Sequence, residues 1–174
     1  MPKSIKEYKT DVRGKILSVK RKVAVYIIVA LIVLTIAYIW LNSVKTQAES
    51  AESSEPVYET IQKVADDVFG EGTVEITHDW VRKFAHFFEF AALGAEFCVL
   101  YILLKRQSLG GFIEMLPFGL YVSVIDEGIQ MLSDRGPEVR DIFIDYGGYL
   151  AATLAFFIVF LIRRAIKNGK EKQA

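Results

Sequence analysis

The stretch VAVYIIVALIVLTIAYIWL, residues 23–41, contains no charged side chain. A helix needs about 20 predominantly apolar residues to cross the hydrocarbon core of a bilayer. This stretch therefore predicts a transmembrane helix. It is long for the apolar core of a secretory signal peptide, and no small-residue cleavage site follows it directly. The only candidate place for cleavage is QAESAES at 47–53, so we expect the helix to be retained.

Three further apolar segments follow, at residues 84–104, 110–132 and 142–162. Each is long enough to span a bilayer, although the first two carry two or three acidic side chains and the last carries Asp145. The links between them, KRQSLG and SDRGPEVR, are short, which favours antiparallel neighbours. The sequence thus predicts an all-α integral membrane protein with four transmembrane helices.

Lysine and arginine residues are concentrated in the N-terminal tail 1–22, at residues 105–106 and in the C-terminal tail 163–174. Cytoplasmic flanks of membrane spans carry an excess of these residues. With four spans, all three basic segments fall on one side. We therefore expect a multi-pass protein of the cell membrane with both termini cytoplasmic.

The formal net charge of zero conceals a segregation of charge, because the segment 42–79 is acidic while both tails are basic. No basic patch is interleaved with aromatic residues outside the apolar segments, so nucleic-acid binding is not expected. The single cysteine, Cys98, excludes an intrachain disulfide.

The segment 42–79 lies outside on this topology and has two parts. SVKTQAESAESSE is polar and of low complexity, and we expect it to be flexible. PVYETIQKVADDVF then places Val57, Ile61, Val64 and Val68 at helical spacing, with Pro56 suited to a first turn. We expect a short amphipathic helix in the outer loop, acting as a lid or packing element or as a partner-binding surface.

Polar residues gather at one level of the predicted bundle. The start of the second span, the end of the third and the start of the fourth all fall on the outer side. Lys83, His86 and Glu89 recur every third residue and so share one helical edge. The residues at this level are Lys83, His86, Glu89, Asp126, Glu127, Gln130, Arg135, Arg140, Asp141 and Asp145.

An ionisable side chain facing lipid costs about 2.5–3.5 kcal/mol on insertion scales. Because several such residues occur together, the favoured arrangement has their side chains facing inward, in a shared polar pocket that opens to the outside. Gly94, Gly147 and Gly148 would let the helices approach closely there. Glu96 and Glu114 lie deeper or near the other boundary, and we interpret both as structural.

Simpler roles exist for three residues taken singly. Lys83 and Arg140 sit at helix ends, where long side chains can reach water along an apolar surface. Asp141 could act only on the dipole of the last helix, an effect of about 0.3–1 kcal/mol. The coincidence of acids from three segments at one level favours a functional pocket over these separate explanations.

Three ordered stretches, RKFAHFFEFAALG (82–94), DEGIQ (126–130) and RGPEVRDIFIDYGG (135–148), resemble the motifs of the VanZ-like membrane protein family, named for a teicoplanin-resistance protein. The resemblance covers roughly residues 80 to 160 and indicates a VanZ-like domain at 80–162. Ser133 and Asp134 depart from its pattern, as does Asp145, where many members have Asn. The resemblance implies a bacterial membrane protein, some members of which lower susceptibility to glycopeptide antibiotics. It implies no reaction.

Two functions remain open. The protein could be an envelope enzyme or binder acting on a lipid-linked or phosphorylated substrate, or on a glycopeptide antibiotic such as teicoplanin. Alternatively it is a structural factor that blocks antibiotic access, with a polar cluster that only fixes helix packing. Membrane lipids are its expected surroundings in both cases.

In the first hypothesis the polar residues divide into two groups. Acid–base and orienting roles would fall to His86, Glu89, Asp126 and Glu127. Substrate binding would fall to Lys83, Gln130, Arg135, Arg140, Asp141 and Asp145, with the cations holding phosphate or carboxylate. No motif predicts a cofactor. Metal binding through His86, Glu89, Glu127 and Asp145 is a third, weaker alternative.

Overall fold

The computed structural model of the chain describes residues 5–133 and 138–171. Within these ranges the chain is helical and contains no β-strand. The helices are α1 (Ile5–Ser43), α2 (Gln47–Phe69), α3 (His78–Leu103), α4 (Leu109–Leu132) and α5 (Val139–Glu171).

Four helical stretches are long and apolar enough to cross a membrane: Ser18–Ser43, His78–Leu103, Leu109–Leu132 and Val139–Lys170. The predicted four-span, all-α architecture is confirmed, and the chain is a multi-pass membrane protein. α1 and α5 extend beyond the predicted spans into the basic segments, where residues 5–22 and 163–171 contain no proline.

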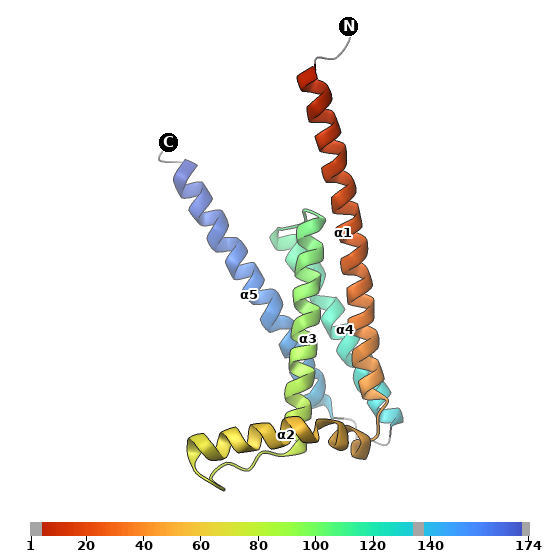
Figure 1. Cartoon of the computed structure of the whole chain (residues 1–174), viewed down its shortest axis with the longest axis vertical. Helices are drawn as coiled ribbons and strands as arrows, with labels where there is room; N and C mark the ends of the chain where they lie inside the picture. The colour runs from red at the N-terminus through yellow and green to blue at the C-terminus, as the bar shows by residue number, and fades with distance from the viewer. Residues whose placement is uncertain (1–4, 134–137, 172–174) are drawn as a thin grey trace.

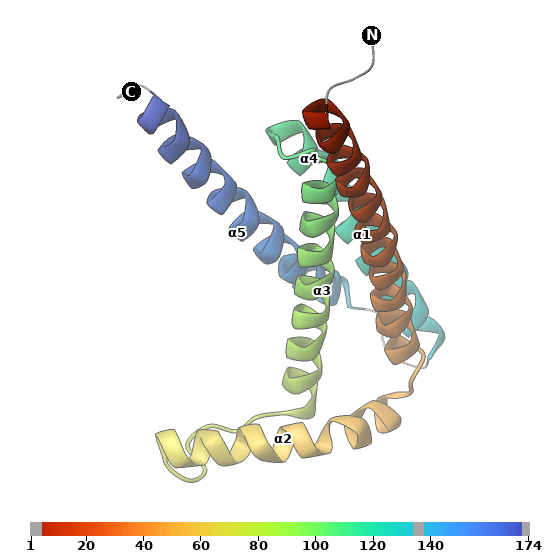
Figure 2. The ribbon, with the colours of Figure 1, turned by 45° about the horizontal axis from the view of Figure 1, so that its top comes forward.

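The four long helices run antiparallel in chain order, and α2 lies across one end of them (Figure 1). The start of α1 and the end of α5 lie at the opposite end, as a second view also shows (Figure 2). α3 is central and contacts each of the other helices, while α5 diverges from it toward the C-terminus (Figures 1 and 2). We call the end that carries α2 the α2 end.

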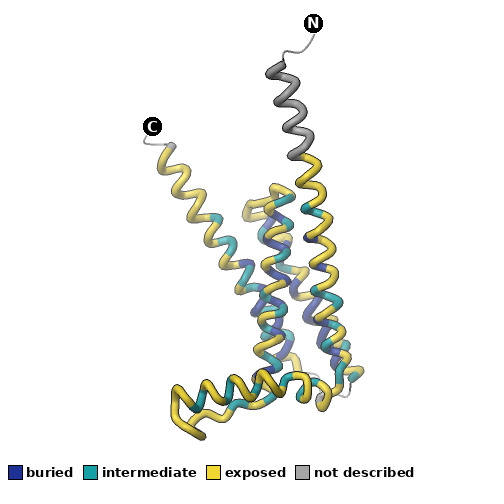
Figure 3. The backbone as a smooth tube through the Cα atoms, viewed as in Figure 1, coloured by how far each residue is buried: buried dark blue, intermediate teal, exposed yellow. Residues whose placement is uncertain are grey.

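The buried residues lie along the stretches where the four long helices pack against one another (Figure 3). Ile39, Phe90, Leu93 and Tyr149 are fully buried, and the Tyr149 hydroxyl donates a hydrogen bond to the Met115 carbonyl at 2.9 Å. The outward faces carry many exposed apolar side chains. This distribution suits helices that meet one another on one side and lipid on the other.

The backbones of α3 and α5 come very close together. A Cβ atom built on Gly148 would lie 2.0 Å from the Phe87 carbonyl oxygen, and one on Gly94 would lie 2.7 Å from the Tyr149 carbonyl oxygen. The predicted close approach is thus confirmed at Gly94 and Gly148. It is not confirmed at Gly147, where a Cβ would meet only the Phe87 ring at 3.9 Å.

α2 is longer than the sequence predicted. The expected flexibility of residues 43–55 is wrong from Gln47 onward, because a capping box starts the helix there. Thr46 Oγ1 accepts a hydrogen bond from the Glu49 backbone N–H at 3.3 Å, and Glu49 Oε2 accepts one from the Thr46 N–H at 2.9 Å. Alanine and glutamate, both good helix formers, then sustain the helix.

Pro56 consequently lies inside α2 and not in its first turn. An internal proline removes one backbone hydrogen bond, yet the helix continues to Phe69. The predicted apolar stripe is present, but Val57, Val64 and Val68 remain exposed within the chain. α2 therefore covers the end of the bundle without burying its own apolar face there.

Candidate functional site

An ion-pair cluster joins the starts of α3 and α5 at the α2 end. We define it as Asp79, Arg82, Lys83, Glu138 and Asp141. Lys83 Nζ lies 3.1 Å from Asp79 Oδ2, 3.0 Å from Glu138 Oε2 and 3.1 Å from Asp141 Oδ1. Arg82 Nη2 lies 2.6 Å from Asp79 and 3.8 Å from Asp141.

This cluster decides between two expectations for Lys83. Its side chain is only 11% exposed, as is that of Asp141. Lys83 therefore does not simply reach out to water from a helix end; it ties α3 to α5 through Asp141, whose side chain is equally buried, and through the more exposed Glu138.

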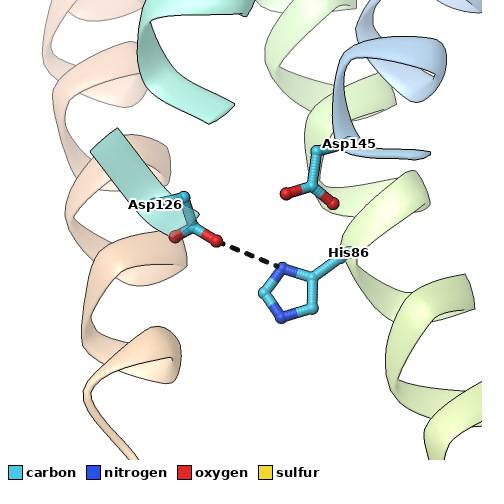
Figure 4. A group of neighbouring side chains, drawn as sticks. All are labelled: His86, Asp126 and Asp145. Carbon is cyan, nitrogen blue, oxygen red and sulfur yellow. Dashed lines mark ion pairs between the residues drawn. The ribbon is translucent and has the colours of Figure 1, made fainter. Parts of the chain in front are cut away.

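Deeper in the bundle, His86 of α3, Asp126 of α4 and Asp145 of α5 point toward one another (Figure 4). We call these residues the three-helix cluster. They are 7%, 0% and 2% exposed, respectively. One ligand atom from each lies within 4.8 Å of the others, and His86 Nδ1 is 3.8 Å from Asp126 Oδ2. Three separate spans thus deliver titratable groups to one point.

Asp126 is held in place by two neutral donors. The Ser43 hydroxyl donates to Oδ1 at 2.6 Å, and Gln130 Nε2 donates to Oδ2 at 2.9 Å. Gln130 stands one helical turn after Asp126 on α4, whereas Ser43 is the last residue of α1. The first span therefore takes part in the site.

Glu89 and Glu127 are both close to the three-helix cluster. Glu89 Oε2 is 3.8 Å from His86 Nδ1, and its Oε1 accepts a hydrogen bond from Asn42 at 3.2 Å. Glu127 Oε1 accepts a hydrogen bond from the Glu138 backbone N–H at 2.5 Å, which holds the start of α5. Glu127 Oε2 is buried without a hydrogen-bond partner among the described residues.

The remaining predicted residues are placed as follows. Arg140 is exposed and makes no ion pair with a described residue, and Arg135 lies outside the described residues. Glu96 accepts a hydrogen bond from Thr35 at 2.8 Å, and Glu114 pairs with Arg106 at 2.6 Å. These last two contacts suit the structural roles expected for both glutamates.

A groove of about 430 Å³ opens between α1, α2 and α3 beside the three-helix cluster. Its lining is divided in character. Aromatic side chains of Tyr38, Phe84 and Phe88 contribute apolar surface, and Asn42, Lys45, His86 and Glu89 contribute polar atoms. His86 belongs to both the groove and the three-helix cluster, so the groove borders that cluster.

Several site residues were missed in the sequence, namely Asn42, Ser43, Asp79, Arg82 and Glu138. A usable signal existed for the first two: a polar pair ends the uncharged span at the level where the other polar residues gather. Arg82 lies within the first motif, but it was missed because it is not part of the helical edge formed by Lys83, His86 and Glu89.

Comparison with known proteins bears on the resemblance noted in the sequence. The model of the VanZ/LLP1 family matches residues 24–161. This range includes α2 and most of the first span, and so extends well before the three motifs. No curated protein and no solved structure gives a significant match. Because the family model covers most of the chain, the chain belongs to the VanZ/LLP1 family.

Proposed function

We propose that the α2 end faces outside the cell and that the groove binds a lipid-linked anionic molecule of the cell envelope. The observation that carries this proposal is the divided lining of the groove. Phe84 and Phe88 offer a surface for a hydrocarbon chain, while Lys45 and Arg82 stand beside the polar part and suit phosphate or carboxylate. An amphiphilic molecule needs both an apolar surface for its chain and cationic side chains for its head group.

The deep end of the groove has the parts for acid–base chemistry on a bound head group. His86 is flanked by Glu89 and Asp126, each 3.8 Å from Nδ1. Carboxylates beside an imidazole orient its ring, and Glu89, which lines the groove, is placed to act as a general base on the head group. Binding of an envelope lipid or of teicoplanin at this place would account for a VanZ-like effect on susceptibility to that antibiotic.

A second candidate is a non-enzymatic factor in which the polar residues only fix helix packing. The ion-pair cluster favours it, because Lys83 and Asp141 are satisfied by one another and by neighbouring helix ends. The two functions differ in what happens when a groove residue is changed without loss of fold.

The test compares His86→Ala and Glu89→Gln with the matched control Glu114→Gln, whose carboxylate pairs with Arg106 far from the groove. Purified protein in nanodiscs is titrated with a polyprenyl phosphate. We expect binding to weaken by about tenfold or more, or about 1.4 kcal/mol, in the two groove variants only. Teicoplanin susceptibility of cells expressing each variant should change in parallel.

Thermal unfolding of the same samples separates the candidates. Unchanged melting with lost binding supports a site. Lower melting of both groove variants with equal binding per folded molecule would instead support the packing role and overturn the lipid site.

The proposed orientation is testable with single cysteines in a Cys98→Ser background, since Cys98 is the one cysteine of the chain. We expect a membrane-impermeant maleimide to label Lys63→Cys on α2 in intact cells. Gly169→Cys, near the end of α5, should react only after permeabilisation. Labelling of Gly169→Cys in intact cells would place the α2 end in the cytoplasm.

A further inference from the structure

Asp145 has no counter-charge in the described part of the chain. Its side chain is 2% exposed, and no hydrogen bond or ion pair reaches it from the described residues. A buried carboxylate without a partner is strongly disfavoured. Lys83 and Arg82 are the nearby cations, but they pair with Asp79 and Asp141.

A small cavity adjoins this side chain. It has a volume of about 10 Å³ and is bordered by His86, Gln130, Asp141 and Asp145 together with Arg82 and Lys83. Such a volume holds a single small occupant, about the size of one water molecule or ion. Asp145 and His86 both border this space. Asp126 lies across from Asp145, with its Oδ2 3.8 Å from His86 Nδ1 (Figure 4).

The three side chains have the spacing that one metal ion would require. Donor atoms bound to a tetrahedral Zn²⁺ at about 2.0–2.2 Å lie roughly 3.4 Å apart. His86 Nδ1 and Asp126 Oδ2 are 3.8 Å apart, which is too long for a hydrogen bond, and the full set lies within 4.8 Å. The donor atoms must therefore close by about 0.4–1.4 Å to surround one ion.

The surroundings also resemble an outer shell of a metal site. Carboxylate ligands of metals are themselves oriented by hydrogen bonds. Asp126 has such bonds from Ser43 and Gln130.

We propose that His86, Asp126 and Asp145 bind one divalent transition-metal ion, with Zn²⁺ as the first candidate. An imidazole with two carboxylates suits Zn²⁺ and Mn²⁺. Three protein ligands leave a coordination position for water or a ligand oxygen, and His86 connects this position to the groove. The ligand set differs from the one considered in the sequence, because Asp126 takes the place of Glu89 and Glu127. The ion would hold α3, α4 and α5 together whatever the groove binds.

The test uses the full chain, stripped with EDTA in detergent and then dialysed against ZnCl₂ or MnCl₂. Metal content is measured by mass spectrometry, and affinity by competition with a chromogenic chelator. We expect one ion per chain for the unchanged protein and for Glu114→Gln. Asp145→Asn should bind Zn²⁺ about tenfold or more weakly.

Thermal unfolding provides a second readout that does not depend on any envelope ligand. Zn²⁺ should raise the melting temperature of the unchanged protein and leave that of Asp145→Asn unaffected. Without metal, Asp145→Asn should melt at or above the unchanged protein, because the substitution removes a buried charge. Absence of bound metal in the folded unchanged protein, or equal metal content in Asp145→Asn, would overturn the proposal. Failure of polyprenyl phosphate binding would leave these outcomes unaffected.

Discussion

Replacing Lys83 by methionine should destabilise the protein by about 3 kcal/mol, the lower end of the range for removing one partner of a buried ion pair. The lysine serves three carboxylates, and Asp141 among them is largely buried. Arg82 remains 3.8 Å from Asp141 after the substitution, which keeps the loss from being larger. Thermal or steric-trap unfolding in detergent would measure the difference.

Arg106→Met is the matched control, because Arg106 and Glu114 form an ion pair whose side chains are 60% and 51% exposed. An exposed pair contributes about 0–1 kcal/mol. The double variant Lys83→Met/Asp141→Leu should be more stable than Lys83→Met, since it removes the carboxylate left without its partner. If Lys83→Met and Arg106→Met unfold alike, the ion-pair cluster does not hold α3 to α5.

Gly148→Ala should also destabilise the protein, by about 1–3 kcal/mol through overpacking. Its added Cβ would stand 2.0 Å from the Phe87 carbonyl oxygen, a backbone atom that cannot rotate away. α5 must therefore move from α3. For a chain of this size each kcal/mol lowers the melting temperature by about 2–4 °C.

Gly128→Ala is the control for this substitution, since a Cβ there would meet nothing within 4 Å. Alanine is a better helix former than glycine by about 1 kcal/mol, so Gly128→Ala should be neutral or stabilising. Because α3 carries His86 and α5 carries Asp145, Gly148→Ala should weaken Zn²⁺ binding as well. Equal melting of the two variants would show that α3 and α5 are farther apart than described.

Much of this arrangement was predictable from one constraint. Charged groups avoid lipid, so acids and a histidine on three apolar spans had to meet inside the bundle. His86, Asp126 and Asp145 do so. The predicted topology needed only span lengths and the positions of lysine and arginine.

The pairing within the polar set was not predictable in the same way. Which acid meets Lys83 depends on how each helix is rotated about its axis, and i, i+3 spacing fixes only the face within one helix. Glu127 illustrates this, because its partner is the backbone N–H of Glu138. A backbone donor cannot be recognised from residue type. Ser43 is similarly inconspicuous, being a small neutral residue.

The extent of α2 was missed for another reason. The low complexity of SVKTQAESAESSE suggested a flexible segment. The sequence nevertheless contained a helix-start signal, because Thr46 is followed three residues later by Glu49. That pair forms a capping box, which specifies a helix start even where the following residues are polar.

The last turn of α1 contributes directly to the polar site, so the first helix does more than anchor the chain in the membrane. Asn42 and Ser43 donate side-chain hydrogen bonds to Glu89 and Asp126, and the Ser133 hydroxyl returns one to the Ser43 carbonyl at 3.0 Å. A fragment that contains only the three motifs would lack Asn42 and Ser43, so Glu89 and Asp126 would lose these hydrogen-bond donors. Co-expression of residues 1–46 as a separate peptide is the natural complementation partner for such a fragment.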